Sequence, residues 1–257
     1  MNLLVVQNVS VNFGGLKALD EVSICVRKGS IAALIGPNGA GKTTLFNVIT
    51  GMIEPTQGTV EINGQEIQGK ATHKMVHFGV SRTFQNIRLI PEMSVLENVL
   101  LGYHTRMKQN LLDSLFYTRR FRKEERENVD KAKILLDFVG LSSYIHERAK
   151  NLPYGLQRLL EIARILAADT ELIMLDEPCA GLNTGEKGLM SKLIRSINDQ
   201  FKKTILLIEH DMRFVMNLAE EITVLDQGNL IATGVPSEIQ KNEQVIAAYL
   251  GRKRKEK

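Results

Sequence analysis

The sequence contains no tryptophan and only two cysteines, Cys25 and Cys179, among its 257 residues. Two cysteines cannot form a disulfide framework, and such low usage is typical of a protein in a reducing compartment. No apolar stretch of the sequence approaches the roughly 20 residues that span a bilayer. The first residues, MNLLVVQNVSVNF, lack a basic segment followed by a long apolar core. We therefore expect neither a secretory signal peptide nor a membrane-spanning helix.

A large excess of one charge is also absent, because the formal net charge is only +4. Hydrophobic residues make up 44% of the chain and charged residues 24%, which is ordinary for a globular protein with a well-filled core. The length allows one large domain or two unequal ones. The tail GRKRKEK, residues 251–257, carries part of the positive charge. We expect it to be a solvated terminus, with contact to an anionic membrane surface as the alternative.

Two hydrophobic patterns predict strands. Apolar and polar residues alternate in residues 3–13 and 19–30, as they do in half-buried antiparallel strands. Nearly continuous apolar runs are typical of parallel strands covered on both faces. These runs are residues 30–36, 171–178 and 203–211.

Helical spacing dominates from about Thr72 to Leu166, where charges are dense and glycines are few. A further helix is expected over residues 187–201, between two of the buried strands. Asn63-Gly64 predicts a tight turn, and residues 227–229 predict the turn of a closing hairpin. The patterns together indicate an α/β core with an antiparallel sheet at its start and a helical insertion in the middle.

The segment GPNGAGKTT, Gly36–Thr44, has the spacing of a phosphate-binding loop between a predicted strand and a predicted helix. Its glycines let the backbone curl so that successive N–H groups face an anion. Lys42 would place its charge beside the β- and γ-phosphates of a nucleotide, and the Thr43 hydroxyl would bind Mg²⁺.

A second motif, LIMLDEP, places two acids at the end of an apolar strand. Asp176 would hold Mg²⁺, directly or through water. Glu177 follows at once, and its carboxylate would accept a proton from an attacking water or orient that water. The pair alone fits a solvated strand end equally well, but together with the phosphate loop it indicates a nucleotide hydrolase.

A third segment, NLPYGLQRLLEIARIL, opens a predicted amphipathic helix at a turn that carries Gly155. Free N–H groups and the positive end of the helix dipole make such a turn suitable for an anion. The plain alternative is an ordinary helix cap.

Five segments stand in the order found in ATP-binding cassette (ABC) ATPases: GPNGAGKTT, RTFQN, LPYGLQR, LIMLDEPCAGLN and LLIEHD. With their flanking segments they resemble that family over nearly the whole chain. The resemblance implies a P-loop NTPase core, with a mostly parallel sheet and helices on both faces, an N-terminal antiparallel β subdomain and a helical subdomain. It also implies ATP and Mg²⁺ as ligands, and a head-to-tail dimer with two ATP molecules between the subunits.

The resemblance assigns roles to individual residues of the chain's own ATP site. Phe13 would stack on adenine, although an aromatic residue at this place is often part of a core. Glu177, His210 and Gln85 would be catalytic, with His210 on the γ-phosphate and Gln85 near Mg²⁺ and the attacking water. The Mg²⁺ ligands would be Thr43, Gln85 and Asp176. The loop residues in contact with ATP would be Gly36, Pro37, Asn38, Gly39, Ala40, Gly41, Lys42, Thr43 and Thr44.

Tyr154, Gly155 and Asn183 would contact the ATP that the partner subunit holds. Here the sequence departs from the family, whose common signature is Leu-Ser-Gly-Gly-Gln. Pro153 replaces the serine and Leu156 replaces the glutamine, so phosphate contact would depend on backbone N–H groups and the helix dipole. Asn183 stands where the family usually has aspartate. Cys179 has no histidine base near it in sequence, so we interpret it as a packing residue.

We expect one nucleotide-binding domain over residues 1–257. Residues 1–85 and 167–250 would form its core and residues 86–166 its helical subdomain, followed by the basic tail at 251–257. In the family, a region corresponding to Asn86–Gly102 forms a groove for a membrane partner, although these apolar positions equally suit an ordinary helical core.

The long basic insertion at residues 103–132, the LPYG signature and the ending VIAAYLG resemble the larger ATPase subunit of branched-chain amino-acid importers. The expected partners are a second ATPase subunit (a copy or a paralogue), two integral membrane permease subunits and, indirectly, a substrate-binding protein, with no nucleic acid. The protein would then lie at the cytoplasmic side of the cell membrane. The alternatives are urea or amide import, lipopolysaccharide export, or a soluble ABC ATPase that acts on ribosomes or DNA.

Overall fold

The computed structural model describes residues 1–104 and 119–250. The basic tail expected at residues 251–257 and the middle of the long basic insertion lie outside these ranges. The chain forms two compact units. The first comprises residues 1–82 and the described residues from Glu171 onward, and the second lies within Thr83–Thr170.

The first unit begins with a four-stranded antiparallel sheet in the order β2-β1-β4-β5. Its strands are β1 (Asn2–Phe13), β2 (Leu16–Arg27), β4 (Gln57–Ile62) and β5 (Gln65–Glu66). The turn between β4 and β5 is Asn63-Gly64, and both residues have positive φ. This confirms the predicted tight turn, because successive left-handed residues match the twist of an antiparallel pair.

The central sheet has six strands in the order β10-β9-β3-β8-β7-β6. They are β3 (Ile31–Ile35), β6 (Val80–Arg82), β7 (Leu172–Asp176), β8 (Thr204–Ile208), β9 (Glu221–Asp226) and β10 (Asn229–Gly234). All pairs are parallel except β9 with β10, which form the predicted closing hairpin. Every residue of β3, β7 and β8 is buried, as the continuous apolar runs predict.

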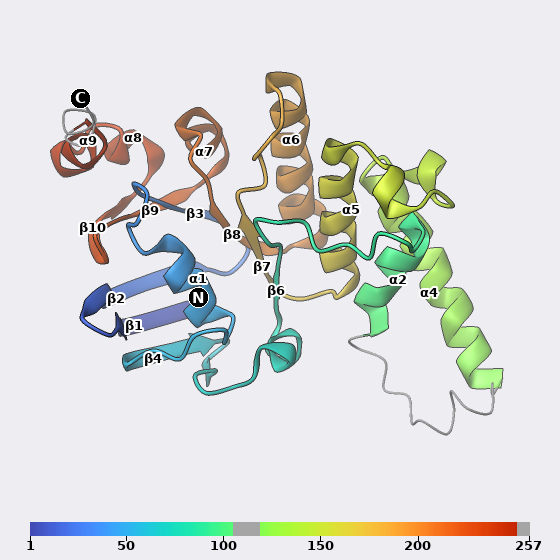
Figure 1. Ribbon diagram of the computed structural model, residues 1–257, viewed down its shortest axis with the longest axis horizontal. Coiled ribbons are helices and arrows are strands. Elements are labelled where there is room, and N and C mark those ends of the chain that lie inside the picture. Colours follow the sequence, from blue (N-terminus) through green and yellow to red (C-terminus); the bar gives the residue numbers. More distant parts are fainter. Residues whose placement is uncertain (105–118, 251–257) are drawn as a thin grey trace. The chain divides into compact units, whose positions relative to one another are not determined.

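Helix α1 (Lys42–Ile49) lies between the two sheets of the first unit (Figure 1). Its buried residues share one hydrophobic core with residues of β1, β2, β4, β3, β7 and β8. Helices α6 (Thr184–Phe201) and α7 (Met212–Leu218) lie on the other side of the central sheet (Figure 1). The unit also contains the 3₁₀ helix η1 (Thr72–Phe78), α8 (Pro236–Ile239) and α9 (Glu243–Leu250). The expected α/β fold is confirmed.

One strand differs from the sequence-based prediction. Helical spacing was expected from about Thr72, but after η1 the chain forms β6, which pairs with β7 at the edge of the central sheet. A three-residue strand is too short to show a periodicity, so hydrophobic patterning cannot detect it.

The second unit is helical. It contains α2 (Val95–His104), α4 (Arg119–Phe138), α5 (Tyr154–Ala167) and the short 3₁₀ helices η2 (Ser142–Tyr144) and η3 (Ala149–Asn151). The helices α2, α4 and α5 pack against one another. Gln85, which the sequence analysis assigned to the core, lies in this unit.

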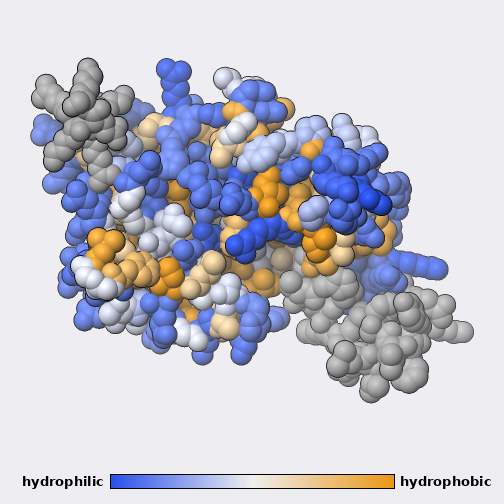
Figure 2. Space-filling model, in the orientation of Figure 1, coloured by the Kyte–Doolittle hydropathy of each residue, from blue (hydrophilic) through white to orange (hydrophobic). Residues whose placement is uncertain are grey.

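Figure 2 shows a face that is mostly hydrophilic, with smaller hydrophobic areas among the polar side chains. Exposed apolar residues include Phe13 and Leu16, at the ends of β1 and β2. Across residues 1–104 and 119–250, no helix has the length and apolarity that a membrane crossing requires.

Candidate functional site

The loop Gly36–Thr44 joins β3 to α1, as the sequence predicts. Lys42 is the first residue of α1 and is only 6% exposed. Its ammonium donates hydrogen bonds to the carbonyl oxygens of Gly36, at 2.7 Å, and Pro37, at 2.9 Å. The loop therefore curls around its own lysine, which places a buried positive charge at the start of a helix, where the dipole also favours an anion.

Gly36 is required by close packing. Its φ is 153°, and a Cβ atom here would lie 2.1 Å from the carbonyl oxygen of Leu225 in β9. No side chain fits at that distance, so only glycine at position 36 lets the loop pass this close to β9. The β9–β10 turn is tied to the same loop, because the Gly228 N–H donates to Ala40 O at 3.0 Å. The turn is also tied to β2, because Gly228 O accepts from the Asp20 N–H at 2.9 Å.

A cavity of about 620 Å³ opens beside the loop, within the range of small-molecule sites. Phe13 lines it together with the loop residues Gly39 to Thr44, and its ring is half exposed. The cavity also has lining residues that the sequence analysis did not identify: Leu16, Lys17, Ala18 and Gln227. They come from the β1–β2 and β9–β10 hairpins, and only their spatial approach to the loop reveals them.

Asp176 ends β7 and is 4% exposed. One of its oxygens accepts a hydrogen bond of 2.6 Å from the guanidinium of Arg82, the last residue of β6. Arg82 also donates to Asn47 at 2.6 Å and to Thr50 at 3.3 Å, and both belong to the α1 region. A buried carboxylate requires such a charged partner. Arg82 therefore fixes the side chain of Asp176 relative to the helix that follows the phosphate loop.

Glu177 and His210 are in direct contact. Nε2 of His210 lies 2.5 Å from Oε1 of Glu177. An ionised carboxylate can only accept, so Nε2 carries the hydrogen. Glu177 has a φ of 49°, a conformation that non-glycine residues rarely adopt, and such strain is found at functional sites. Its N–H donates to Ile208 O at 3.0 Å, which holds this turn against β8.

Glu209 is a buried acid beside the site that the sequence analysis did not identify. It is 4% exposed, and its two oxygens accept hydrogen bonds from the Cys179 N–H at 2.7 Å and from the His210 N–H at 3.0 Å. The segment after Glu177 and the residue His210 are therefore fixed by one carboxylate. Burial, followed by the nearby Glu209, raises the pKa of the Cys179 thiol, which agrees with a packing role.

Asn183 is the N-cap of α6. Its side-chain oxygen accepts from the Glu186 N–H at 3.0 Å, and the Glu186 carboxylate accepts from the Asn183 N–H at 2.8 Å. This reciprocal pair is a capping box, which satisfies two helix N–H groups. Asn183, which the sequence predicts to contact the ATP of the partner subunit, thus stabilises the start of α6.

Gln85, Tyr154 and Gly155 belong to the second unit. Gln85 is exposed, Tyr154 is 45% exposed, and Pro153 caps α5 without a side-chain hydrogen bond. The side chain of Arg158 brings Gln85 and Tyr154 together, because it donates to the carbonyl oxygen of Gln85 and to the hydroxyl of Tyr154.

The residues expected to hold Mg²⁺ are oxygen donors: the Thr43 hydroxyl, the Asp176 carboxylate and the Gln85 amide. In the part of the chain that the structure describes, no three His, Cys, Asp or Glu side chains gather into a metal site. Mg²⁺ is usually held by one or two carboxylates together with water and substrate phosphates, so the oxygen ligands of the predicted set fit this ion. The buried carboxylate of Asp176 at the strand end suits that use.

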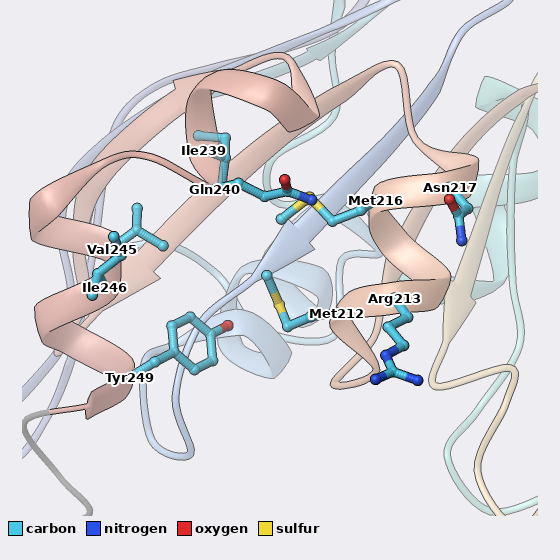
Figure 3. Close-up of a pocket in the computed structure, with 9 residues that line it drawn as sticks. All are labelled: Met212, Arg213, Met216, Asn217, Ile239, Gln240, Val245, Ile246 and Tyr249. Carbon is cyan, nitrogen blue, oxygen red and sulfur yellow. The ribbon is translucent and has the colours of Figure 1, made fainter.

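A second cavity, of about 560 Å³, lies between α7, α8 and α9 (Figure 3). Met212 and Met216 enter it from α7, and Ile239, Val245 and Tyr249 face them from α8 and α9. Burial raises the pKa of Tyr249 to about 12, although a hydrogen bond from the backbone of Gly36 lowers it in part. The C-terminal helix therefore reaches the first residue of the phosphate loop.

Comparison with protein families gives two matches. The model for ABC transporters matches residues 19–180, and a model for branched-chain amino acid ATP-binding cassette transporters matches residues 229–254. The second match includes α8 and α9, which supply part of the lining of the second cavity.

Curated relatives match almost from end to end. The chain is 45% identical to the high-affinity branched-chain amino acid transport ATP-binding protein LivG of Salmonella typhimurium, over 97% of this chain and 98% of the relative. It is 44% identical to BraF of Pseudomonas aeruginosa, which has the same description, over the same shares. It is 38% identical to a probable LivG of Methanocaldococcus jannaschii, over 98% of each chain.

Among solved structures, the ADP conformation of an ATP-binding cassette of an ABC transporter is similar, with a TM-score of 0.85 and 36% identity. The match covers 98% of this chain and 99% of that chain. A nucleotide-free ATP-binding cassette is similar with a TM-score of 0.82 and the same identity, over 97% of this chain and 99% of that chain.

Proposed function

The chain belongs to the ATP-binding cassette family of ABC transporters, and from this membership we propose that it powers the import of branched-chain amino acids. The family consists of ATPases. The observation that carries the choice of solute is the end-to-end similarity to branched-chain transport proteins, supported by the separate match of residues 229–254. The cavity beside the phosphate loop would bind ATP and not the transported solute. The choice of solute therefore depends on the similarity to the relatives alone.

ATP would lie in the cavity beside the phosphate loop. The ring of Phe13, half exposed at the cavity, supports stacking on adenine. Lys42 already lies within the loop and would exchange its two carbonyl partners for the β- and γ-phosphates. The loop N–H groups and the start of α1 would hold the remaining phosphate oxygens.

Thr43, Asp176 and Gln85 would hold Mg²⁺, which when bound neutralises charge that develops on the phosphates. Asp176 is kept in place by Arg82, so its carboxylate has a defined orientation. Because the transfer of a phosphoryl group to water requires little covalent help, this positioning is the main contribution of the protein.

Glu177 would accept the proton of the attacking water. Its contact with His210 orients the carboxylate, and Glu209 fixes the backbone of His210. When ATP is bound, His210 would donate its Nε2–H to the γ-phosphate in place of Glu177. The three side chains lie at the C-terminal ends of β7 and β8, the edge at which open α/β sheets bind their ligands.

Members of the family act as dimers with membrane permeases. We propose a second ATPase subunit, identical or paralogous, whose ATP is contacted by Tyr154, Gly155 and Asn183 of this chain. Two integral membrane permease subunits would place the protein at the cytoplasmic side of the cell membrane, and a substrate-binding protein would act indirectly. ATP would draw the two subunits together, and hydrolysis would release them.

The experiment that tests this function is leucine uptake into vesicles that contain the purified permeases and this subunit. Wild type should take up leucine only with ATP. Glu177→Gln removes the proton acceptor, so phosphate release and uptake should fall by about 100-fold or more, while ATP binding is retained. Glu221→Gln, the same chemical change on β9, is the matched control and should leave both rates unchanged.

Three results would contradict the proposed solute or the transport function. Uptake of urea or an amide, without uptake of leucine, would favour another ABC importer. Export of lipopolysaccharide would favour an exporter. Co-purification of the tagged chain with ribosomes or DNA, and with no integral membrane partner, would overturn the transport function.

A further inference from the structure

Arg82 and Asp176 form a buried ion pair at the ends of the neighbouring parallel strands β6 and β7. A guanidinium nitrogen of Arg82 lies 2.6 Å from a carboxylate oxygen of Asp176, and the two side chains are only 7% and 5% exposed. A buried ion pair adds little stability compared with apolar side chains of the same volume, because both charges lose their hydration. A function therefore explains this pair better than a gain in stability does.

Neutral groups of the α1 region hold the guanidinium of Arg82 in place. It donates to the side chains of Asn47 at 2.6 Å and Thr50 at 3.3 Å. Its central carbon lies 5.4 Å from the centre of the Phe46 ring, whose face attracts a positive charge. None of these three side chains carries a charge, so they fix the position of the guanidinium without cancelling its charge. That charge compensates the carboxylate of Asp176.

Asp176 is therefore a weak ligand for a divalent cation that arrives without a nucleotide. The neighbouring Glu177 is in contact with His210, and within the described ranges no cluster of three His, Cys, Asp or Glu side chains supplies further ligands. Mg²⁺ gives up its water reluctantly and is usually bound through one or two carboxylates together with substrate phosphates. A cation that approaches the Asp176 carboxylate also approaches the positive guanidinium of Arg82, which repels it.

We propose that Arg82 is a built-in counter-charge that makes divalent-cation binding at Asp176 depend on ATP. This rests on the proposed function, in which the phosphate loop binds ATP and Asp176 contributes to the Mg²⁺ site. Without a nucleotide, the charge of Arg82 occupies the carboxylate and disfavours a cation there. Bound ATP brings several negative charges to the phosphate loop, and their attraction for the cation exceeds the repulsion from Arg82. Arg82 thus acts through Asp176 as a positioning residue.

Binding of Mn²⁺, a paramagnetic substitute for Mg²⁺, tests the proposal by electron paramagnetic resonance. The parent is the full chain with Glu177→Gln, so that ATP is not consumed, and it should bind Mn²⁺ at this site only when ATP is present. Arg82→Gln keeps an amide that can donate to Asp176 but removes the charge. This variant should bind Mn²⁺ without ATP, at least about tenfold more tightly than the parent. Arg213→Gln, the same change at an exposed arginine of α7, is the matched control and should behave as the parent does.

Arg82→Lys separates the charge from the contacts, because it keeps the positive charge and loses the forked geometry of the guanidinium. It should still require ATP for Mn²⁺ binding. Asp176→Asn, added to Arg82→Gln, should abolish the ATP-independent binding and so assign it to Asp176. Circular dichroism verifies that each variant is folded. If Arg82→Gln does not fold, Arg82→Lys decides the question, since ATP-independent binding by this variant would show that the contacts and not the charge control the cation.

Two further results would overturn the proposal. One is an Arg82→Gln variant that is folded and binds Mn²⁺ no more tightly than the parent without ATP. The other is a parent that binds Mn²⁺ without ATP and loses this binding with Asp176→Asn. A parent that binds neither ATP nor Mn²⁺ with ATP would instead contradict the proposed function, so the two failures are distinguishable.

Discussion

Glu209 and Glu177 show that neighbouring acids at strand ends have different tasks. Glu177 contacts His210 with its side chain and is 19% exposed, whereas Glu209 is buried and accepts hydrogen bonds from two backbone N–H groups. The partly exposed carboxylate of Glu177 fits the proposed role in proton transfer. The buried one acts as a fixed acceptor that holds the segments on either side.

We predict that Glu209→Gln lowers the free energy of unfolding by about 1.5–3 kcal/mol, the usual contribution of a hydrogen bond to a charged group. The amide has one acceptor oxygen for two N–H groups and presents its own donors to the other. Urea denaturation at neutral pH measures the change. Glu221→Gln is again the control, with an expected change within about 0.5 kcal/mol. Equal stability of the two variants would contradict the role of Glu209.

We predict that Tyr249 makes the protein less stable at alkaline pH. Its pKa is about 12 in the folded protein and 10.0 ordinarily, because burial disfavours the phenolate. The contribution of the neutral Tyr249 side chain to the free energy of unfolding is fully present below pH 10. It is lost as the pH rises from 10 toward 12, because Tyr249 ionises first in the unfolded chain. Tyr249→Phe should therefore weaken the alkaline loss of stability, measured as urea midpoints against pH. Parallel pH profiles for both proteins would contradict this.

One glycine sets how closely the helices α2 and α5 pack. A Cβ atom on Gly102 would lie 2.3 Å from Arg164 O and 2.7 Å from the Ala167 Cβ. At this point α2 and α5 approach too closely for any side chain. The hydrophobic spacing that predicted the helices does not contain this information.

We predict that Gly102→Ala destabilises the second unit by about 1–3 kcal/mol, the usual cost of overpacking. Gly188→Ala in α6 is the matched control. Nothing lies within 4 Å of a Cβ at Gly188, so alanine there should stabilise the helix by about 0.5–1 kcal/mol. Denaturant midpoints of the two variants should move in opposite directions. A shift in the same direction would show that α2 and α5 separate easily.

The whole molecule contributes only part of each proposed ATP site. We predict that Glu177→Gln with ATP and Mg²⁺ forms dimers, because bound ATP is no longer consumed and contacts both subunits. Size-exclusion chromatography with light scattering measures the mass, alone and with a paralogous subunit. Lys42→Ala in the same background should remain monomeric, since it removes the charge that binds the phosphates. A monomer under every condition would contradict the shared site.

Much of the fold could be predicted from the sequence. Continuous apolar runs predicted β3, β7 and β8, because strands buried on both faces show no polar alternation. The strand β6 was missed because three residues carry no period. The cavity residues Lys17 and Gln227 were also missed, since neither belongs to a motif and they enter the site from the start of β2 and from the β9–β10 turn.

By itself, the sequence determined the phosphate loop, the Asp176-Glu177 strand end and the helix start at Tyr154, because the geometry of each depends on consecutive residues. Only the tertiary structure decided which groups distant in sequence meet. Arg82 reaches Asp176 across 94 residues of sequence, and Arg158 reaches Gln85 across 73. The first contact depends on how β6 pairs with β7, and the second on how the segment of Gln85 packs against α5. Burial, which makes an unpaired charge costly, exists only once the chain has folded.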